Sequence, residues 1–557
     1  MDRNFLLAMG LSFAVLVLWT MYTEGQRPPE PPPGQAVPEL GTTPEAQPPR
    51  PASPLAEPAA PAPPPAPTAP ALLEAERPPE QRIRIQTDLV DAEFSSWGGG
   101  LVRWSLLDYD DPSQPGRPPV DMTTLGRGDG IALATPFADL GHGDLSFASY
   151  SAQQPDEKTL VFTHERSGLR IRKTYLFEGD YDFRLRLEVE NGASTAVSSS
   201  FVGNWPITRR DSADFEDYSA ASYQDGELAI YFVSAPPAFL GMGPGAADEP
   251  AEHTGNVDWA GAQTRYFLAA LLPDNPRDAS MRFTPTVPGE RALVEVGFPR
   301  AELPPGGRLD REYRVYLGPK EPDRLDAVGA HLDEAIQKGW FPSLTRFFTW
   351  LLTAAHEVIP NYGVAIILIT IAVRLLMAPL MARQMKSMKR MSVLQPRMKE
   401  IQERYPDDRQ KQSEAMMALY KEAGVNPLSM MTGCLPMFLQ LPVFIGFYYA
   451  LQGAIQLRQQ PFVGWIDDLS RPEALFVIPG LDLPVRLLPI LMGASMVAQQ
   501  KLTPTAMDPA QARIMLTVMP VMFTVMFYQF ASGLVLYWLV STLLGIAQQV
   551  LTNRSKT

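Results

Sequence analysis

Hydrophobic and polar positions alternate with a period of two over a long stretch in the first half of the chain. The clearest run alternates four apolar with four charged residues: Phe183, Arg184, Leu185, Arg186, Leu187, Glu188, Val189 and Glu190. Such alternation predicts strands with one buried face. Further strands are expected at Ile83–Ile85, Leu169–Phe177, Thr264–Leu272, Leu293–Phe298 and Glu312–Leu317. Residues 81–320 are therefore expected to form an all-β sandwich domain.

The period becomes helical in the segment 340–358. Apolar residues recur there at spacings of three and four: Leu344, Phe347, Phe348, Leu351, Leu352 and Ala355. One continuous apolar stripe with Trp340 and Trp350 nearby predicts an amphipathic helix that lies in a membrane interface. The last helix of a soluble domain is the alternative.

Long apolar runs occur at the start of the chain and throughout its last third. Phe5–Tyr22 is apolar apart from Ser12 and Thr20, and no A-x-A-like cleavage site follows it. Residues 1–24 are therefore expected to be an uncleaved signal anchor that spans the membrane. Five further spans are expected within the helical core 361–557, at about 361–381, 430–455, 486–500, 514–530 and 533–551.

The charge distribution orients these spans. Residues 341–557 carry 19 Lys and Arg against 12 Asp and Glu, which leaves −20 for the first 340 residues of a chain with net charge −13. Long apolar runs beside basic loops indicate the cytoplasmic face of a membrane rather than a nucleic acid as the partner. The loop 382–426 holds ten Lys and Arg against six acids, and the loop 457–486 holds three against four. Both termini are therefore expected in the cytoplasm and the β domain outside.

A Pro-rich segment at 25–80 separates the first span from the β domain. It contains 20 prolines between Pro28 and Pro79, a composition that favours extended chain and cannot bury a core. It is interpreted as a tether.

Several function classes are excluded or disfavoured by what the sequence lacks. The chain has one cysteine, which excludes an intramolecular disulfide framework and a multi-thiolate metal site. It has no GxxxxGK[ST] phosphate-binding loop, which disfavours an activity driven by nucleotide hydrolysis. The histidines have no metal-ligand spacing, and the last five spans contain no Asp or Glu, which disfavours a proton-coupled transporter. No cofactor and no metal are expected.

Arg374 is the candidate functional residue within the second span. It precedes Arg383, the first clearly cytoplasmic charge, by nine residues, or roughly 13 Å of helix. A guanidinium at that depth needs a polar partner or water. Uncharged polar groups in the spans could line a wet cavity with it: Thr370, Gln440, Gln499, Gln500, Tyr537, Ser541, Thr542 and Gln548. Snorkelling of Arg374 to the cytoplasmic interface is the alternative.

The cytoplasmic loop 382–424 is expected to form a helical hairpin broken at Tyr405–Asp408. Its first helix carries a methionine stripe with adjacent cations, a candidate contact surface for hydrophobic segments or anionic headgroups: Met385, Met388, Lys389, Arg390 and Met398. The seam between the two helices is the alternative role of this stripe. The fourth span has only about twelve apolar residues before Gln499, which favours a locally thinned bilayer.

A set of short motifs lies within residues 340–551: Arg374–Leu380, Leu394–Lys399, Met416–Lys421, Val425–Leu428, Gly433–Pro442, Trp465–Ser470 and Ser532–Tyr537. In these motifs the helical region resembles the YidC/Oxa/Alb family of membrane protein insertases. The anchor, tether and β domain resemble the Gram-negative form, whose large periplasmic domain is a β-supersandwich.

The resemblance implies a hydrophilic intramembrane groove, open to the cytoplasm and lipid, that receives the polar tail of a client protein. The groove residues are Arg374, Thr370, Gln440, Tyr537, Trp538 and Ser541. Trp538 stands where relatives often carry Tyr, and Ala531 stands where Pro is common. The apolar segment of the client would slide out along the third and fifth spans.

The predicted function is that of a membrane protein insertase and chaperone, not an enzyme, in the bacterial inner membrane. It would act alone or with the Sec translocon, with nascent membrane proteins, lipids, Sec components and the ribosome as partners. An envelope assembly scaffold with a periplasmic binding domain is the alternative, and a polar-solute transporter is a third candidate.

Overall fold

The computed structural model describes residues 78–112, 114, 116–123, 131–208, 218–233, 248–406, 408–422, 435–481, 483–503 and 509–554. The predicted signal anchor and nearly all of the Pro-rich tether lie outside these residues.

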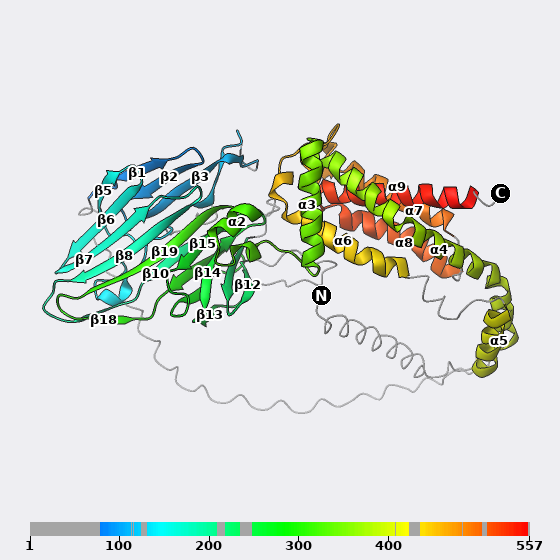
Figure 1. The fold of residues 1–557 in the computed structure, drawn as a ribbon, viewed down its shortest axis with the longest axis horizontal. Coiled ribbons are helices and arrows are strands. Elements are labelled where there is room, and N and C mark those ends of the chain that lie inside the picture. Colours follow the sequence, from blue (N-terminus) through cyan, green and yellow to red (C-terminus); the bar gives the residue numbers. More distant parts are fainter. Residues whose placement is uncertain are drawn as a thin grey trace, which may run out of the picture. The chain divides into compact units, whose positions relative to one another are not determined.

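Residues 82–319 form a β domain of antiparallel strands (Figure 1). Its strands are β1 Arg82–Gln86, β2 Val90–Ser95, β3 Gly100–Asp110, β4 Pro119–Asp121, β5 Ser151–Asp156, β6 Thr159–Arg166, β7 Leu169–Leu176, β8 Asp182–Asn191, β9 Val197–Ser199, β10 Val202–Thr208, β11 Ser219–Gln224, β12 Glu227–Phe232, β13 Ala251–Thr254, β14 Val257–Gln263, β15 Phe267–Pro273, β16 Ser280–Val287, β17 Arg291–Gly297, β18 Ala301–Leu303 and β19 Arg308–Pro319. Nine of them form one sheet in the order β12-β11-β14-β15-β19-β8-β7-β6-β5. Four-stranded sheets β1-β2-β3-β4 and β10-β17-β16-β13 and a pair β18-β9 complete the described strands of the domain.

The alternation seen in the sequence corresponds to the two faces of this large sheet. On β8, Phe183, Leu185 and Leu187 are fully buried, whereas Arg184 and Arg186 are exposed. Burial of alternate apolar side chains is the main stabilising term for such a sheet. The predicted β domain is therefore confirmed.

The strand predicted from Thr264 is wrong at its start. Residues Thr264–Tyr266 connect β14 to β15, and the Thr264 amide donates to the Phe267 carbonyl at 2.9 Å. Seven consecutive residues of β15 are buried, because neighbouring layers cover both of its faces, so alternation could not locate its first residue.

Two short helices connect the β domain to the longer helix α3. They are α2 Pro322–Val328 and η5 Leu332–Ala335, and α3 extends over Pro342–Val358. The ring of Phe348 on α3 packs edge to face against the ring of Phe447, which lies on the later helix Leu435–Gly453, with 5.1 Å between the ring centres. Phe347 and Trp350 of α3 remain exposed. The apolar stripe of α3 is thus partly buried against a neighbouring helix, and its position in a membrane interface remains a prediction.

The C-terminal region is helical. Its elements are α4 Tyr362–Arg404, α5 Arg409–Glu422, α6 Leu435–Gly453, η7 Ile455–Leu457, the strands β20 Phe476–Ile478 and β21 Leu483–Val485, α7 Leu487–Leu502, α8 Pro509–Phe527 and α9 Ser532–Arg554. The second predicted span and the first helix of the cytoplasmic hairpin are one continuous helix of 43 residues, α4, which continues through Pro379 and Pro396. The β-rich domain followed by a helical region matches the predicted fold class.

Two segments in the described residues are long and apolar enough to cross a membrane. They are Tyr362–Ala382 of α4, with mean hydropathy 2.4, and Ser532–Leu551 of α9, with mean hydropathy 1.7. Leu516–Phe527 of α8 is a shorter apolar helix. The predicted number of spans is therefore not established by helix length alone.

Contacts between the helices define their relative directions. On α4 and α9, Gly533 lies beside Ile366, and further along both helices the Gln548 amide donates to the Ala378 carbonyl at 2.9 Å. Residue numbers thus increase in the same direction along both helices, so α4 and α9 run parallel.

The other pairs give a consistent pattern. Helix α7 is also parallel to α9, because Gln499 lies beside Gly545 and Thr503 beside Gln549. Helix α8 is antiparallel to α7, since Arg486 contacts Tyr528 whereas Gly493 contacts the earlier residue Thr524.

Helix α6 is antiparallel to α9. Gln440 near the start of α6 contacts Tyr537, and Tyr448 near its end contacts Phe530, which precedes α9. The directions of α4, α6, α7, α8 and α9 thus alternate in chain order.

Candidate functional site

One face of α9 is polar in an otherwise apolar helix. Tyr537, Ser541, Gly545 and Gln548 follow one another at spacings of four, four and three, which places them on one helical face. This face contacts α4, α6 and α7. We call the polar side chains that meet there the polar seam; they are Arg374, Gln440, Gln499, Tyr537, Ser541 and Gln548.

Arg374 on α4 donates to a single hydroxyl on α9. Its Nε lies 2.9 Å and one of its terminal nitrogens 2.7 Å from Ser541 Oγ. In the described part of the chain, no carboxylate lies within ion-pair distance of this guanidinium. A guanidinium has five N–H donors, and this contact uses two of them. The hydroxyl carries no charge, so it does not neutralise the guanidinium.

Tyr537 joins the same seam from one turn earlier on α9. Its hydroxyl accepts a hydrogen bond from Gln440 Nε2 of α6 at 3.0 Å and interacts with Ser541 and Arg374. Its ring is buried and lies 4.7 Å from the ring of Phe447. Side chains from α4, α6 and α9 therefore converge on the guanidinium.

Gly545 allows the helices to approach one turn further along. A Cβ at this position would lie 2.6 Å from Gln499 Nε2 on α7 and 3.8 Å from a terminal nitrogen of Arg374. Only a glycine leaves this space to the glutamine amide. Sequence reasoning missed Gly545, although its spacing of four from Ser541 carried the signal.

Two of the predicted groove residues are placed differently from the rest. The Thr370 hydroxyl is buried and donates to the Ile366 carbonyl of its own helix at 2.6 Å, one turn before Arg374. The indole of Trp538 packs against aromatic rings of α6 and α8, 4.9 Å from Phe444 and 5.0 Å from Phe527. The structure thus brings Arg374, Gln440, Tyr537 and Ser541 together, with Thr370 turned to its backbone and Trp538 in an aromatic cluster.

The predicted helical hairpin is formed by the end of α4 and by α5. Met398 Sδ accepts from the Tyr420 hydroxyl at 3.8 Å, and Tyr420 is buried between the two helices. Met398 therefore lies in the seam between the helices, which was the alternative to a contact surface. Met385 is half-buried, and the side chains of Met388, Lys389 and Arg390 lie outside the described part of the structure, so their role in contacts remains a prediction.

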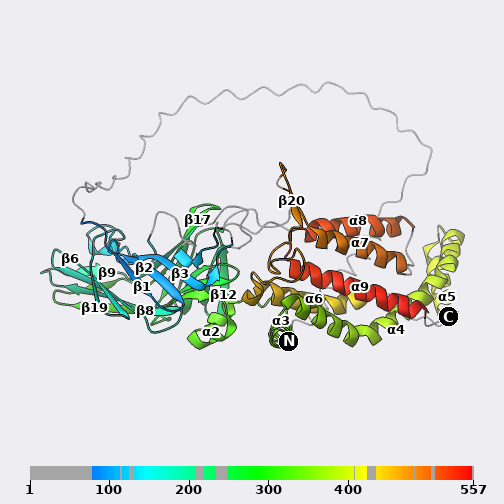
Figure 2. The ribbon, with the colours of Figure 1, turned by 90° about the horizontal axis from the view of Figure 1, so that it is seen from above.

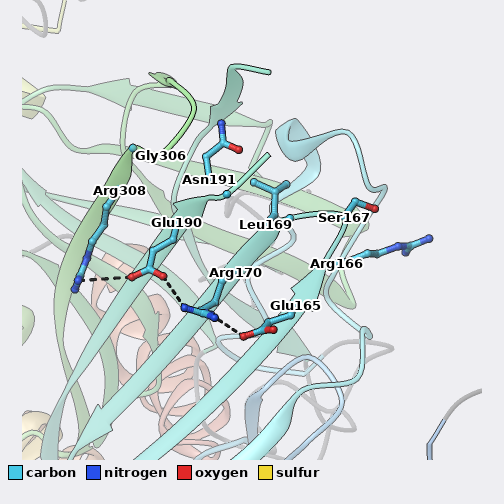
Figure 3. Close-up of a pocket in the computed structure, with 12 residues that line it drawn as sticks. Glu165, Arg166, Ser167, Leu169, Arg170, Glu190, Asn191, Gly306 and Arg308 are labelled. Carbon is cyan, nitrogen blue, oxygen red and sulfur yellow. Dashed lines mark hydrogen bonds and ion pairs between the residues drawn. The ribbon is translucent and has the colours of Figure 1, made fainter. Parts of the chain in front are cut away.

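The β domain has a polar pocket of its own, with a volume of about 690 Å³ (Figure 3). Turns at Gly168, Gly192 and Gly306 and charged side chains at the ends of β6, β7, β8 and β19 line it. Two of its arginines contact carboxylates: Arg170 lies 2.6 Å from Glu165 and 3.2 Å from Glu190, and Arg308 contacts Glu188 and Glu190.

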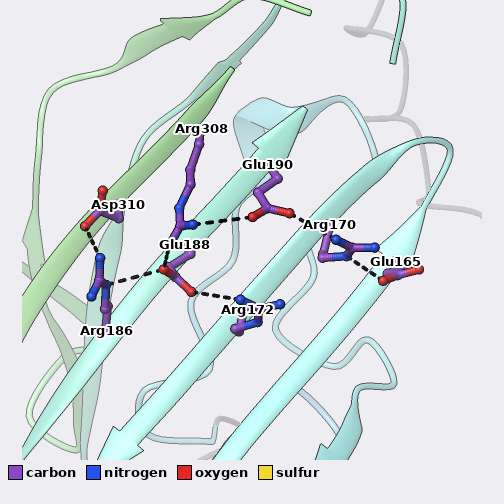
Figure 4. A network of polar contacts seen from close by, with 8 residues as sticks. All are labelled: Glu165, Arg170, Arg172, Arg186, Glu188, Glu190, Arg308 and Asp310. Atoms are coloured by element: carbon purple, nitrogen blue, oxygen red, sulfur yellow. Dashed lines mark hydrogen bonds and ion pairs between the residues drawn. The ribbon is translucent and has the colours of Figure 1, made fainter. Parts of the chain in front are cut away.

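These pairs belong to a wider network on the exposed face of the sheet (Figure 4). At its centre the Glu188 carboxylate contacts three arginines, Arg172, Arg186 and Arg308. The Glu188 carboxylate is itself buried beneath these arginines, whereas the outer pairs are exposed and each contribute little to stability, typically below about 1 kcal/mol. The network is a neutralised, solvated sheet face.

Two buried lysines in the β domain also lack carboxylate partners among the described residues. Lys173 Nζ donates to three backbone carbonyls, those of Gly98 at 2.6 Å, Ala134 at 2.7 Å and Leu133 at 3.1 Å. Burial lowers the pKa of Lys173 well below its usual value. These carbonyls match the three N–H groups of the ammonium, so Lys173 is a structural cation.

Lys320 is buried where β19 meets the connection to α3. Its Nζ donates to Gln263 Oε1 at 2.5 Å and to the Ala335 carbonyl at 3.2 Å. Burial lowers the pKa of Lys320 to about 7. No group of three or more His, Cys, Asp or Glu in the described residues is arranged to hold a metal ion.

Comparison with known families gives two matches, which meet within α3. Residues 82–351 match the family model of the YidC periplasmic domain, and residues 354–557 match that of the 60Kd inner membrane protein. Together the two matches cover the β domain, the connecting helices and the whole helical region.

Full-length relatives are similar across both parts. The chain is 34% identical to the membrane protein insertase YidC of Geotalea uraniireducens (strain Rf4), covering 100% of this chain and 99% of that protein. It is also 34% identical to the membrane protein insertase YidC of Syntrophus aciditrophicus (strain SB), with 100% of both chains covered.

Solved structures that match the chain include a crystal structure of an active YidC insertase with its first transmembrane domain resolved. It is 20% identical and covers 84% of this chain and 92% of that one, with a TM-score of 0.34. YidC from Thermotoga maritima is 14% identical, covers 84% of this chain and 97% of that one, and gives a TM-score of 0.28. Because both TM-scores are low, the assignment depends on the sequence matches. On those matches, the chain belongs to the YidC family of membrane protein insertases, inner-membrane proteins with a periplasmic domain.

Proposed function

We propose that this protein inserts client proteins into the inner membrane by accommodating their polar tails at the polar seam. The observation that carries the proposal is Arg374, a cation on an apolar helix whose neighbour in the described structure is a hydroxyl rather than a carboxylate. A charge in such a setting is costly, so its retention favours a functional role. The full-length insertase relatives support the same activity.

The proposed topology has α4, α6, α7, α8 and α9 as five successive crossings, with the N-terminal anchor as a sixth. The alternating directions of the five helices support it, because successive crossings must alternate. The basic loop between α4 and α6 would face the cytoplasm, as would both termini.

The energetics of insertion need no nucleotide. Transfer of an apolar client segment from water to lipid is favourable, and the barrier is the passage of its polar flank. A potential that is positive outside contributes about 2.3 kcal/mol per negative charge per 100 mV, which draws an acidic tail outward.

Arg374 would hold the client tail during this passage. Ser541 uses the Nε edge of the guanidinium, and the remaining donors can bind a client carboxylate or a backbone carbonyl. Gln440, Gln499 and Tyr537 would offer further uncharged hydrogen-bond groups along the path. No bond is made or broken, so the protein acts as an insertase and chaperone, not as an enzyme.

The remaining partners are part of the proposal. The Sec translocon and the ribosome fit the basic cytoplasmic hairpin and the supply of nascent clients, and lipids would surround the five helices. Recruitment of envelope partners by the β domain is the second candidate function, and its polar pocket is the observation that favours it.

Reconstitution tests the proposal. A single-span client with an acidic tail is added to liposomes that contain only this protein, with and without a membrane potential. We expect insertion above that of empty liposomes, enhanced by a potential that is positive outside. Insertion equal to that of empty liposomes would contradict an autonomous insertase.

A further inference from the structure

A short hairpin between α6 and α7 carries apolar side chains on both of its faces. It consists of β20 and β21, joined by a turn at Pro479 and Gly480, and it projects sideways from one end of α7 and α8 (Figure 2). We call residues 475–485 the apolar hairpin. Its exposed side chains are between 41% and 73% accessible: Leu475, Phe476, Val477, Leu481 and Leu483. Asp482 is the one charged residue in this sequence.

The apolar hairpin is firmly attached at its base. The Leu475 amide donates to the Val485 carbonyl at 2.9 Å, and the hydroxyl of Tyr528, just after α8, donates to the Pro484 carbonyl. The Arg486 guanidinium lies 4.8 Å from the centre of the Tyr528 ring and donates to the Tyr528 carbonyl. The hairpin is thus held in place by the outer ends of α7 and α8.

A second set of contacts fixes the segment on the other side. The Glu473 carboxylate is buried and accepts from the Leu488 amide at 2.8 Å and from Trp465 Nε1 at 2.7 Å. The Glu473 carboxylate is therefore paired at the base, and the described side chains of the projecting part are apolar.

We infer that the apolar hairpin inserts into the headgroup and upper acyl region of the outer lipid leaflet. This inference rests on the proposed crossing of the membrane by α7 and α8. Phe476 and Val477 are neighbours on one strand, so they point to opposite faces of the hairpin, and both are about half exposed. A protein partner would cover one face, whereas a lipid surface surrounds both.

The two helices that hold the hairpin also expose apolar side chains. Exposed apolar side chains run along α7 and α8 below it: Ile490, Leu491, Val518, Val521 and Val525. Tyr528 at the base has the amphipathic character of residues that gather at membrane interfaces.

The depth of insertion is limited by the backbone of the hairpin. A two-stranded hairpin has two edges with unpaired N–H and C=O groups, which hydrocarbon cannot satisfy. Each strand has three residues, about 10 Å in length, so the hairpin is a short element beside the ends of the two helices. The headgroup region, where water is available, therefore fits the hairpin better than the hydrocarbon centre.

This anchor has a consequence for α7, whose apolar run is short. Leu487–Ala498 spans about 18 Å against a hydrocarbon core of about 30 Å. If the hairpin holds the outer end of α7 at headgroup level, the apolar run of α7 ends before it reaches the cytoplasmic headgroups. The missing length then lies in the cytoplasmic leaflet, beside Gln499, Gln500 and Lys501. The thinned side of the bilayer would then be the side from which clients arrive.

Fluorescence quenching in proteoliposomes tests the inference. Single cysteines are introduced by Val477→Cys and Leu481→Cys in a Cys434→Ser background and labelled with bimane. Two controls use the same background: Val525→Cys on the lipid-facing side of α8, and Gln153→Cys, exposed on β5. Quenchers are aqueous iodide and phospholipids with a nitroxide near the top of the acyl chain.

We expect iodide to quench the Val477 and Leu481 labels at least about threefold less than the Gln153 label, and the nitroxide lipids to quench them to a similar extent as the Val525 label. Quenching by iodide as strong as at Gln153, without lipid quenching, would overturn the inference. Protection from both quenchers would also overturn it, because a protein would then cover the hairpin. A Val525 label that lipids do not quench would instead contradict the proposed topology.

Discussion

Buried basic side chains in the two regions of this protein differ in how many of their N–H donors have an acceptor. In the β domain, Lys173 is surrounded by three backbone carbonyls that match its three N–H groups. In the helical region, Arg374 has one hydroxyl as its acceptor in the described structure and five N–H donors. A fully matched cation stabilises a fold, whereas one with donors to spare can bind a ligand.

The exposed face of the β sheet provides a third case. There Arg172, Arg186 and Arg308 contact the carboxylate of Glu188, and further pairs with Asp310, Glu190 and Glu165 balance the charge of the network as a whole. The comparison shows that the number of arginines does not identify the site. The site is identified instead by the absence, among the described residues, of a carboxylate partner for Arg374.

Removal of Arg374 gives the largest expected effect. In Arg374→Ala, insertion of a client with an acidic tail should fall about tenfold or more, because hydrogen bonds to a charged group contribute roughly 1.5–3 kcal/mol. A client with an uncharged tail should be affected less than about threefold. The measurement is the fraction of client inserted into proteoliposomes.

Two variants serve as controls for this prediction. Arg374→Lys keeps the charge and should retain part of the activity, and Arg186→Ala removes an exposed arginine of the sheet network and should leave insertion unchanged. Equal loss for both clients in Arg374→Ala would mean that the guanidinium supports the fold rather than the tail.

The acceptor of Arg374 is expected to matter next. Ser541→Ala removes the hydroxyl that orients the guanidinium, and insertion of the acidic-tailed client should fall about fivefold, since a hydrogen bond contributes about 1 kcal/mol. Thr542→Ala is a matched control, because the Thr542 hydroxyl donates to the Trp538 carbonyl of its own helix at 2.9 Å. A similar loss in both variants would point to general destabilisation of α9.

The buried Lys320 is expected to make the free energy of unfolding depend on pH. Its pKa is about 7 in the folded protein and about 10.5 when unfolded, so the unfolded chain binds more protons between these values. Stability should therefore rise with pH, by about 1–3 kcal/mol between pH 7 and pH 9. Lys320→Met should lose most of this dependence. Urea unfolding of the full chain in detergent, followed by near-UV circular dichroism, measures it, and an unchanged slope in the variant would contradict the role of Lys320.

Deletion of residues 85–315 should have the smallest effect on insertion, within about twofold of the full chain, because the polar seam lies entirely in α4, α6, α7 and α9. The same liposome assay measures it. Loss of insertion, with the shortened protein still in the membrane, would favour the scaffold alternative, in which the β domain does the essential binding.

The β domain could be predicted from sequence because its strands bury one face, and burial of one face produces alternation, as on β8. The same signal fails on β15, where both faces are buried. Tyr537 and Ser541 could likewise be predicted as candidates, because they are uncharged polar residues in a long apolar run.

The partners of these residues could not be predicted, because they depend on which helices become neighbours. Gln440 and Tyr537 are 97 positions apart, and Arg374 and Ser541 are 167 apart. Local spacing contains no information about such pairs. The methionine stripe shows the same limit, since Met398 contacts Tyr420 across the hairpin rather than forming an open surface.

The most direct test of the central claim is to locate the client tail during insertion. Cysteines introduced by Gln440→Cys, in the polar seam, and by Val525→Cys, on the lipid-facing side of α8, are compared in a Cys434→Ser background. The client carries one cysteine in its acidic tail and is arrested during insertion by a bulky C-terminal fusion. The account predicts disulfide crosslinking of the tail to position 440, lost in the additional variant Arg374→Ala. Crosslinking at position 525 as strong as at 440, or crosslinking at 440 that is independent of Arg374, would contradict it.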